Sequence, residues 1–153
     1  MIRNSECEDL SMKIMIMDGQ GGGVGRSLVE ALTERFPKAQ LIAVGTNAAA
    51  TANMMKGGTT NGATGENAVI YNSSRVDVIV GPVGIVLANA MLGEITPKMA
   101  EAVASSNAKL ILLPVNKCHA LVVGVEAKKL GDYVKDAVKA IGELAEAREY
   151  GNA

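Results

Sequence analysis

The stretch from Lys13 to Ser27 reads KIMIMDGQGGGVGRS and decides the fold class. Residues 13–17 form a short, mostly apolar run that is typical of a buried strand, and Asp18 follows it. A cluster of glycines comes next, and from Val24 onward the apolar residues recur at helical spacing. A strand, a glycine turn and a helix in this order begin a βα unit, so the sequence predicts an α/β protein.

The same alternation continues along the chain. Apolar runs predict further buried strands at residues 40–44, 77–80 and 110–115. Apolar spacing and small residues predict helices at 24–36, 48–56, 66–73, 97–105 and 130–148, and the polar, glycine-rich residues 59–65 predict a loop. Residues 83–92 are almost wholly apolar, so we expect a buried helix there, which is also the candidate interface of a homodimer.

The end of the predicted sheet differs from its beginning. Residues 120–125 read ALVVGV and predict a last strand, separated from the strand at 110–115 by only residues 116–119. So short a connection cannot carry a parallel crossover, and we therefore expect this pair to be antiparallel. The predicted fold is a three-layer Rossmann-like sandwich whose sheet is mostly parallel, with a C-terminal antiparallel hairpin strand.

Composition narrows the class of protein. The 153 residues suit one domain, expected over residues 12–150 after a flexible polar lead-in at 1–11 that lacks a signal core. A net charge of −1 and 3% aromatic residues argue against a nucleic-acid partner, and no apolar stretch is long enough for a membrane span. Two cysteines, Cys7 and Cys118, suggest free thiols and a cytoplasmic location.

The glycine cluster is the candidate ligand site. The dinucleotide pattern G-x-G-x-x-G does not fit it, but the looser G-x-x-x-G-x-G pattern fits at Gly19, Gly23 and Gly25. Glycines let the backbone approach a phosphate, and the helix N-terminus adds free N–H groups and partial positive charge. Five glycines in seven residues cost chain entropy, which favours ligand binding over a purely structural turn.

Two further tests limit the chemistry of this loop. The run GGGVGRS also looks similar to a deviant triphosphatase loop, but Arg26 stands where that loop needs Lys, so triphosphatase chemistry is not expected. Dinucleotide sites usually have an acid at the end of the second strand, where this chain has Thr46 and Asn47. Either side chain could hydrogen-bond a ribose. NAD(P) or another nucleotide is still the expected cofactor, although this chain lacks the acid that would support a dinucleotide.

The candidate binding residues share a position at the carboxyl ends of predicted strands, where α/β sheets bind ligands. They are Asp18, Gly19, Gln20, Gly21, Gly22, Gly23, Val24, Gly25, Thr46, Asn47, Gly81, Pro82 and Asn116.

Catalytic residues are not assigned. The Tyr-x-x-x-Lys pair of short-chain dehydrogenases is absent, because Tyr71 is followed by Arg75 and Tyr133 by Ala137. His119 is the only histidine, which excludes a cluster of histidines around a metal, and its neighbour Cys118 would point to the opposite face of a strand.

Six short motifs carry a resemblance. They are DGQGGGVG (18–25), GTNA (45–48), GATGENA (62–68), VGPVGI (80–85), MLGEIT (91–96) and LPVNKC (113–118). Over about residues 12–133 the chain resembles an uncharacterised bacterial family of small Rossmann-like proteins, a domain of unknown function. The resemblance implies the fold and the glycine loop as the site, and it supplies no substrate.

Three functions are compatible with these observations. The leading one is binding of a nucleotide or dinucleotide phosphate at the glycine loop. A second is a non-catalytic regulatory or scaffold subunit with structural glycines. A third is a small enzyme that acts on a phosphorylated metabolite with Glu66 or Asp18 as base.

Overall fold

The computed structural model describes residues 12–115 and 120–150. In chain order the elements are β1 (Lys13–Asp18), α1 (Gly23–Arg35), β2 (Gln40–Gly45), α2 (Ala48–Met55), β3 (Gly62–Thr64), α3 (Glu66–Ser73), β4 (Val78–Pro82), the 3₁₀ helix η2 (Val83–Val86), α4 (Pro97–Ala104), β5 (Lys109–Leu113) and α5 (Leu130–Tyr150). No helix in these two ranges is both long and apolar enough to cross a membrane.

The sheet has five strands in the order β3-β2-β1-β4-β5, and every pair is parallel. The chain first builds outward from β1 to β2 and β3, then returns to the other side of β1 for β4 and β5. The direction of winding therefore reverses between β1 and β4. This arrangement confirms the predicted α/β class with parallel strands and is consistent with a Rossmann-like sandwich.

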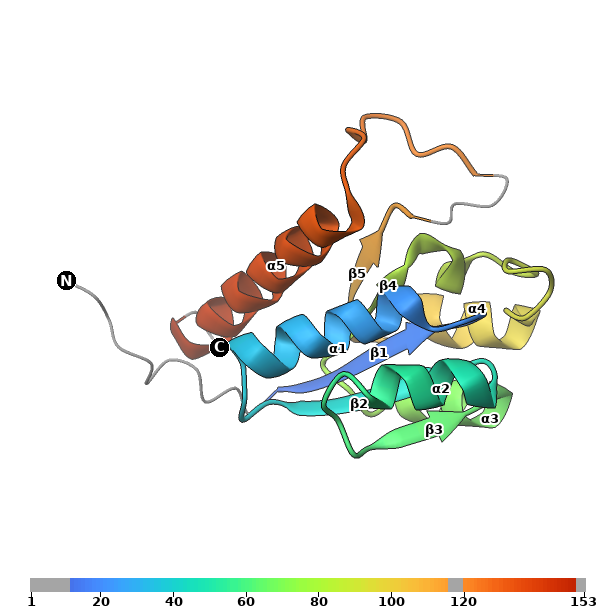
Figure 1. The fold of residues 1–153 in the computed structure, drawn as a ribbon, viewed down its shortest axis with the longest axis horizontal. Coiled ribbons are helices and arrows are strands. Elements are labelled where there is room, and N and C mark those ends of the chain that lie inside the picture. The colour runs from blue at the N-terminus through green and yellow to red at the C-terminus, as the bar shows by residue number, and fades with distance from the viewer. Residues whose placement is uncertain (1–11, 116–119, 151–153) are drawn as a thin grey trace.

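Alternating side chains of β1 explain why helices cover both faces of the sheet. Ile14 and Ile16 pack with buried residues of α1, α2 and α5, whereas Met15 and Met17 pack with buried residues of α3, α4 and the segment after β4. All four side chains are fully buried, as expected for a central parallel strand. Figure 1 shows α5, α1 and α2 side by side in front of the sheet, with α3 and α4 behind it.

Two helix starts next to the carboxyl edge of the sheet have side-chain caps. Asn47 follows β2, and its Oδ1 accepts the backbone N–H of Ala50 at 2.9 Å. Thr96 accepts the N–H of Met99 at 3.1 Å, and Pro97 occupies the first turn of α4, where a missing N–H costs nothing. Helix α1 differs, because its cap residue Gly22 offers no side chain. The N-terminus of α1 is thus left open to the surroundings.

The predicted antiparallel strand at residues 120–125 is wrong. None of these residues belongs to a strand, and the side chains of Leu121 and Val123 are 83% and 89% exposed. A run of β-branched residues favours a strand only where a neighbouring strand and a covering layer bury it. In the structure β5 ends the sheet, and this segment packs against neither the sheet nor a helix layer that would bury Leu121 and Val123.

The predicted helix at residues 83–92 is also wrong. Only Val83–Val86 is helical, as a 3₁₀ turn, and Asn89, Met91 and Leu92 have φ of 66°, 57° and 57°. The apolar composition instead reflects burial of Ile85, Ala90 and Met91 against the α3–α4 face of the sheet. Since these side chains are covered within the chain, they do not require a partner; the homodimer stays a prediction.

A third difference concerns the predicted loop at residues 59–65. Gly62–Thr64 forms β3, which pairs with the end of β2. Three residues of mostly exposed Gly, Ala and Thr carry no hydrophobic signal, so periodicity could not find this strand.

Candidate functional site

The glycine loop lies at the carboxyl edge of the sheet, where the winding reverses. The loop after β1 (residues 19–22) and the segment after β4 (residues 83–96) lie on either side of this point. In parallel α/β sheets the ligand crevice forms at this position because the two loops diverge there. A pocket of about 320 Å³ occupies it, lined by residues 18–24, Met91 and Leu130.

Asp18 fixes the shape of the loop. Its Oδ1 accepts the backbone N–H of Gly19 at 2.8 Å, and its Oδ2 accepts that of Gly25 at 2.7 Å, so one carboxylate joins the end of β1 to the first turn of α1. The side chain is 3% exposed. Burial raises the pKa of Asp18 above its ordinary value, although the N–H groups of Gly25 and Gly19 oppose the shift. With both oxygens bound to the backbone, Asp18 is a structural acceptor rather than a base.

Three of the five glycines lie in crowded positions. A Cβ at Gly19 would lie 2.7 Å from the Met91 Sδ and 2.8 Å from the Thr46 Oγ1. Gly22 has φ of 73° and its N–H bonds to the carbonyl of Gly19 at 2.9 Å; a Cβ at Gly22 would meet the Ala50 carbonyl oxygen at 2.6 Å. A Cβ at Gly25 would collide with the Met54 side chain and lie 2.9 Å from the Asp18 Cβ. A larger residue at any of these three positions would force neighbouring atoms to move, which is the purely structural explanation for glycine.

Gly21 and Gly23 do not fit that explanation. A Cβ at either residue would meet no atom within 4 Å, and neither has a positive φ. Gly23 is the first residue of α1. In the part of the chain that the structure describes, no hydrogen bond reaches the N–H of Gly21 or Gly23. The loop thus presents two bare N–H groups at a helix N-terminus, which is the arrangement that binds anions.

Glu94 does not line the pocket, but it joins the glycine loop to the end of β2, and the sequence did not indicate it. Its Oε1 accepts three hydrogen bonds, from the Gln20 N–H at 2.9 Å, the Thr46 hydroxyl at 2.6 Å and the Asn47 amide at 2.8 Å. Burial raises the pKa of Glu94, but these three donors outweigh it and hold the pKa below its ordinary value. Glu94 is therefore ionised at neutral pH.

The reason it was missed is its distance in sequence. The dinucleotide pattern places an acid directly after β2, whereas Glu94 lies 47 positions beyond Asn47, in the motif MLGEIT after β4. The segment after β4 crosses the reversal point and brings the carboxylate to the end of β2.

Arg26 is not available to a phosphate in the pocket. Its Nε bonds to Glu30 at 2.9 Å and its Nη1 to the Oδ1 of Asn53 at 3.0 Å. Asn53 in turn donates to the Gly21 carbonyl at 2.9 Å. The guanidinium thus contacts the loop only through Asn53, and no lysine or arginine lines the pocket.

The predicted site residues do not all reach the pocket, and Gly25 packs against Met54 without lining it. Residues 18–24 line the pocket, while Thr46 and Asn47 adjoin the loop through Glu94 and through a bond from Asn47 to the Gln20 carbonyl at 3.0 Å. Gly81 and Pro82 lie buried in β4, where a Cβ at Gly81 would collide with the Met17 carbonyl oxygen. Asn116, with Cys118 and His119, lies outside the described residues.

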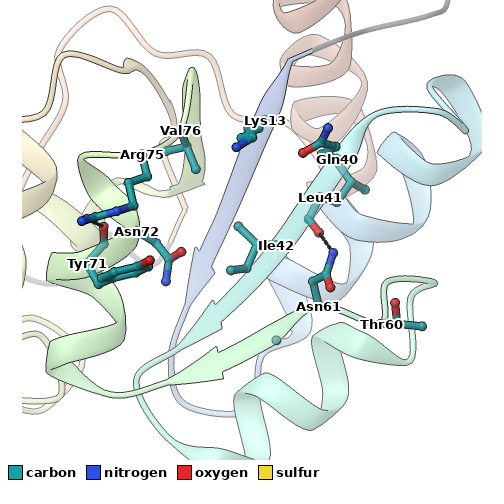
Figure 2. Close-up of a pocket in the computed structure, with 11 residues that line it drawn as sticks. Lys13, Gln40, Leu41, Ile42, Thr60, Asn61, Tyr71, Asn72, Arg75 and Val76 are labelled. Carbon is teal, nitrogen blue, oxygen red and sulfur yellow. Dashed lines mark hydrogen bonds between the residues drawn. The ribbon is translucent and has the colours of Figure 1, made fainter.

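A second pocket, of about 460 Å³, lies at the opposite edge of the sheet (Figure 2). Lys13 and Gln40 at the amino ends of β1 and β2 line it, together with Tyr71 and Arg75. The Arg75 guanidinium stacks on the Tyr71 ring at 3.8 Å and donates to the Tyr71 carbonyl at 2.7 Å. The amino edge has no glycine loop and lies away from the reversal point, so we do not assign the functional site to this pocket.

The described residues form no candidate metal centre. No group of three or more His, Cys, Asp or Glu side chains within residues 12–115 and 120–150 could hold a metal ion. Tyr71 stacks with Arg75, and the Tyr133 hydroxyl donates to the Glu126 carbonyl.

Comparison with known proteins gives a family but no activity. No curated protein matches the chain. A family described as a domain of unknown function, DUF3842, matches residues 13–146, which include every strand of the sheet and the whole glycine loop. The chain belongs to the DUF3842 family, a domain of unknown function.

Proposed function

We propose that this protein binds a nucleotide or dinucleotide by placing its phosphate on the glycine loop at the N-terminus of α1. The observation that carries the proposal is the open backbone of Gly21 and Gly23, whose glycines neither packing nor φ requires. Glycine at such positions costs about 0.5–1 kcal/mol relative to alanine, and a ligand that approaches the backbone offsets this cost.

The charges around the loop favour one kind of phosphate. Asp18 and Glu94 are both carboxylates, the pocket lining contains no cation, and Arg26 is held by Glu30 and Asn53. A terminal phosphate with two negative charges should bind more weakly than a pyrophosphate diester, which carries only one charge on each phosphate. N–H groups at a helix N-terminus are sufficient for such a diester in dinucleotide sites.

The size of the pocket supports a second candidate. A volume of about 320 Å³ is at the lower end of the range for ligand pockets and suits a phosphorylated metabolite smaller than a dinucleotide. If such a ligand is transformed, Asp18 is a poor base because both of its oxygens are bound to N–H groups.

Thermal-shift measurements with NAD, NADP, ADP and sugar phosphates test the proposal, since a ligand that binds only the folded state raises Tm. Gly23→Val should abolish the shift, because its side chain fills the space over the loop. Gly131→Val is the matched control, since Gly131 also lies in the first turn of a helix with no atom within 4 Å of an added Cβ. Absence of any shift in the wild type, or an equal loss in both variants, would contradict the proposal and favour a scaffold.

A further inference from the structure

A single oxygen of Glu94 joins the ends of β1 and β2. The Gln20 N–H belongs to the loop after β1, and the side chains of Thr46 and Asn47 directly follow β2; all three donate to Oε1 within 2.9 Å. The same oxygen would lie 3.2 Å from a Cβ placed on Gly19. The carboxylate is thus held directly beside the first glycine of the loop.

This position has a known use in dinucleotide-binding sheets. There, an acid at the end of the second strand accepts hydrogen bonds from the ribose hydroxyls of the nucleotide whose phosphates lie on the loop. The sequence of this chain lacks that acid, because β2 is followed by Thr46 and Asn47. Glu94 puts a carboxylate in contact with those two side chains from another element, the segment after β4.

We propose that Glu94 recognises the ribose hydroxyls of the ligand and excludes ligands with a phosphate on the ribose 2′ oxygen. The inference rests on the proposed function, and it names the ligand class more narrowly: a ribonucleotide whose ribose hydroxyls carry no phosphate, or an NAD-type dinucleotide. Three donors fix Oε1, and in the described part of the chain no hydrogen bond reaches Oε2, which is left to accept from a hydroxyl.

The chemistry of the surroundings supports this selectivity. A carboxylate that already receives three hydrogen bonds stays ionised and acts only as an acceptor. The groups that donate to it, the Gln20 backbone and the side chains of Thr46 and Asn47, are neutral, so none of them would compensate the charge of a 2′ phosphate. Sites that accept such a phosphate place an arginine at this position.

Isothermal titration of the full chain with two pairs of probes tests the inference. The pairs are ADP against 2′-deoxy-ADP, and NAD against NADP. We expect the wild type to bind the first member of each pair about 10- to 100-fold more tightly, the range for one hydrogen bond to a charged group. In Glu94→Gln both ratios should fall to about twofold or less, because the neutral amide offers nitrogen where Oε2 was and no longer repels a phosphate.

Ratios within one variant make the test independent of folding stability. Glu101→Gln, an exposed position in α4, is the matched control and should keep the wild-type ratios. Equal affinities within both pairs in the wild type would overturn the inference while leaving phosphate binding intact. If Glu94→Gln bound all four probes more tightly than the wild type, the inference would also be overturned. The Glu94 carboxylate would then obstruct the ligand instead of accepting hydrogen bonds from its ribose hydroxyls. Failure of the wild type to bind any of the four probes would overturn the proposed function as well.

Discussion

Alanine at two adjacent glycines, Gly22 and Gly23, should change stability in opposite directions. At Gly22 alanine must adopt φ near 73°, which costs about 1–2 kcal/mol for an L residue. Its Cβ would also lie 2.6 Å from the Ala50 carbonyl oxygen and 2.9 Å from the Ala50 Cα, so the start of α2 must move. Overpacking of this kind costs about 1–3 kcal/mol, and Gly22→Ala should therefore lose about 2–5 kcal/mol in all.

Gly23→Ala should instead raise the free energy of unfolding. The residue begins α1, has a helical backbone and leaves room for a Cβ on every side. Replacing such a glycine restricts the unfolded chain and stabilises by about 0.4–1 kcal/mol. The two variants should therefore differ by about 2.5–6 kcal/mol, although they alter neighbouring residues of one loop.

Urea denaturation followed by far-ultraviolet circular dichroism measures both values, and the absence of tryptophan makes this preferable to fluorescence. Two results would refute the reasoning. One is a Gly22→Ala variant within about 0.5 kcal/mol of the wild type. The other is a Gly23→Ala variant that is less stable than the wild type, since an open glycine could then not be attributed to ligand access. A stabilised Gly23→Ala variant with weaker nucleotide binding would separate the two uses of glycine in this loop.

Three further variants test other parts of the site. Burial raises the pKa of Asp18, so the folded state holds the proton of this carboxyl more firmly than the unfolded state does. The free energy of unfolding should therefore fall as pH rises through and above about 4. Urea titrations at several pH values should show this loss in the wild type and not in Asp18→Asn. The pH dependence due to Glu94 has the opposite sign, because its pKa is lowered in the folded state. Its contribution to stability is present near neutral pH and should disappear on acidification below about pH 4. A Glu94 carboxyl resonance that titrates above the ordinary range would contradict this. Asn47→Ala removes the cap of α2 and should cost about 0.5–2 kcal/mol of unfolding free energy, more than Asn67→Ala at an exposed position of α3. Leu92→Gly should stabilise by up to about 1 kcal/mol, because Leu92 is 98% exposed at φ 57°, and a destabilised variant would show that its side chain makes a contact.

Hydrophobic periodicity was sufficient for most of the fold. The strands at residues 13–17, 40–44 and 77–80 were predicted within one or two residues of β1, β2 and β4, because both faces of a central parallel strand are buried and leave a continuous apolar run. The amphipathic pattern of α5 was equally informative. Its stripe of Val134, Ala137 and Ile141 packs on the core.

The two wrong elements show where that signal is ambiguous. Residues 83–92 and 120–125 are both apolar, yet the first is a buried turn and the second an exposed segment. Apolar composition by itself determines neither backbone conformation nor burial. The positive φ values at Asn89, Met91 and Leu92 follow from the tertiary position of the segment, because none of these residues prefers that conformation strongly enough to determine it.

The candidate site was predictable only as far as it is local in sequence. The bond from Asp18 to Gly25 spans seven residues, and the loop between them could be read as one motif. Glu94 reaches Gln20, Thr46 and Asn47 across 47 to 74 positions. Such a contact depends on the order of strands in the sheet, which places the segment after β4 beside the loop after β1.

Backbone strain gives an independent reason to regard this segment as part of the site. Positive φ costs about 1–2 kcal/mol at each of Met91 and Leu92, whereas asparagine tolerates it at Asn89, and such strain persists only where surrounding contacts enforce it. Here the contacts are burial of Met91 against the α3–α4 face and the three bonds that hold Glu94 to the ends of β1 and β2. A glycine or a longer turn would relieve the strain without disturbing the sheet. A strained turn that ends in a carboxylate beside a glycine loop is therefore better explained by the position that the carboxylate must hold than by the stability of the fold.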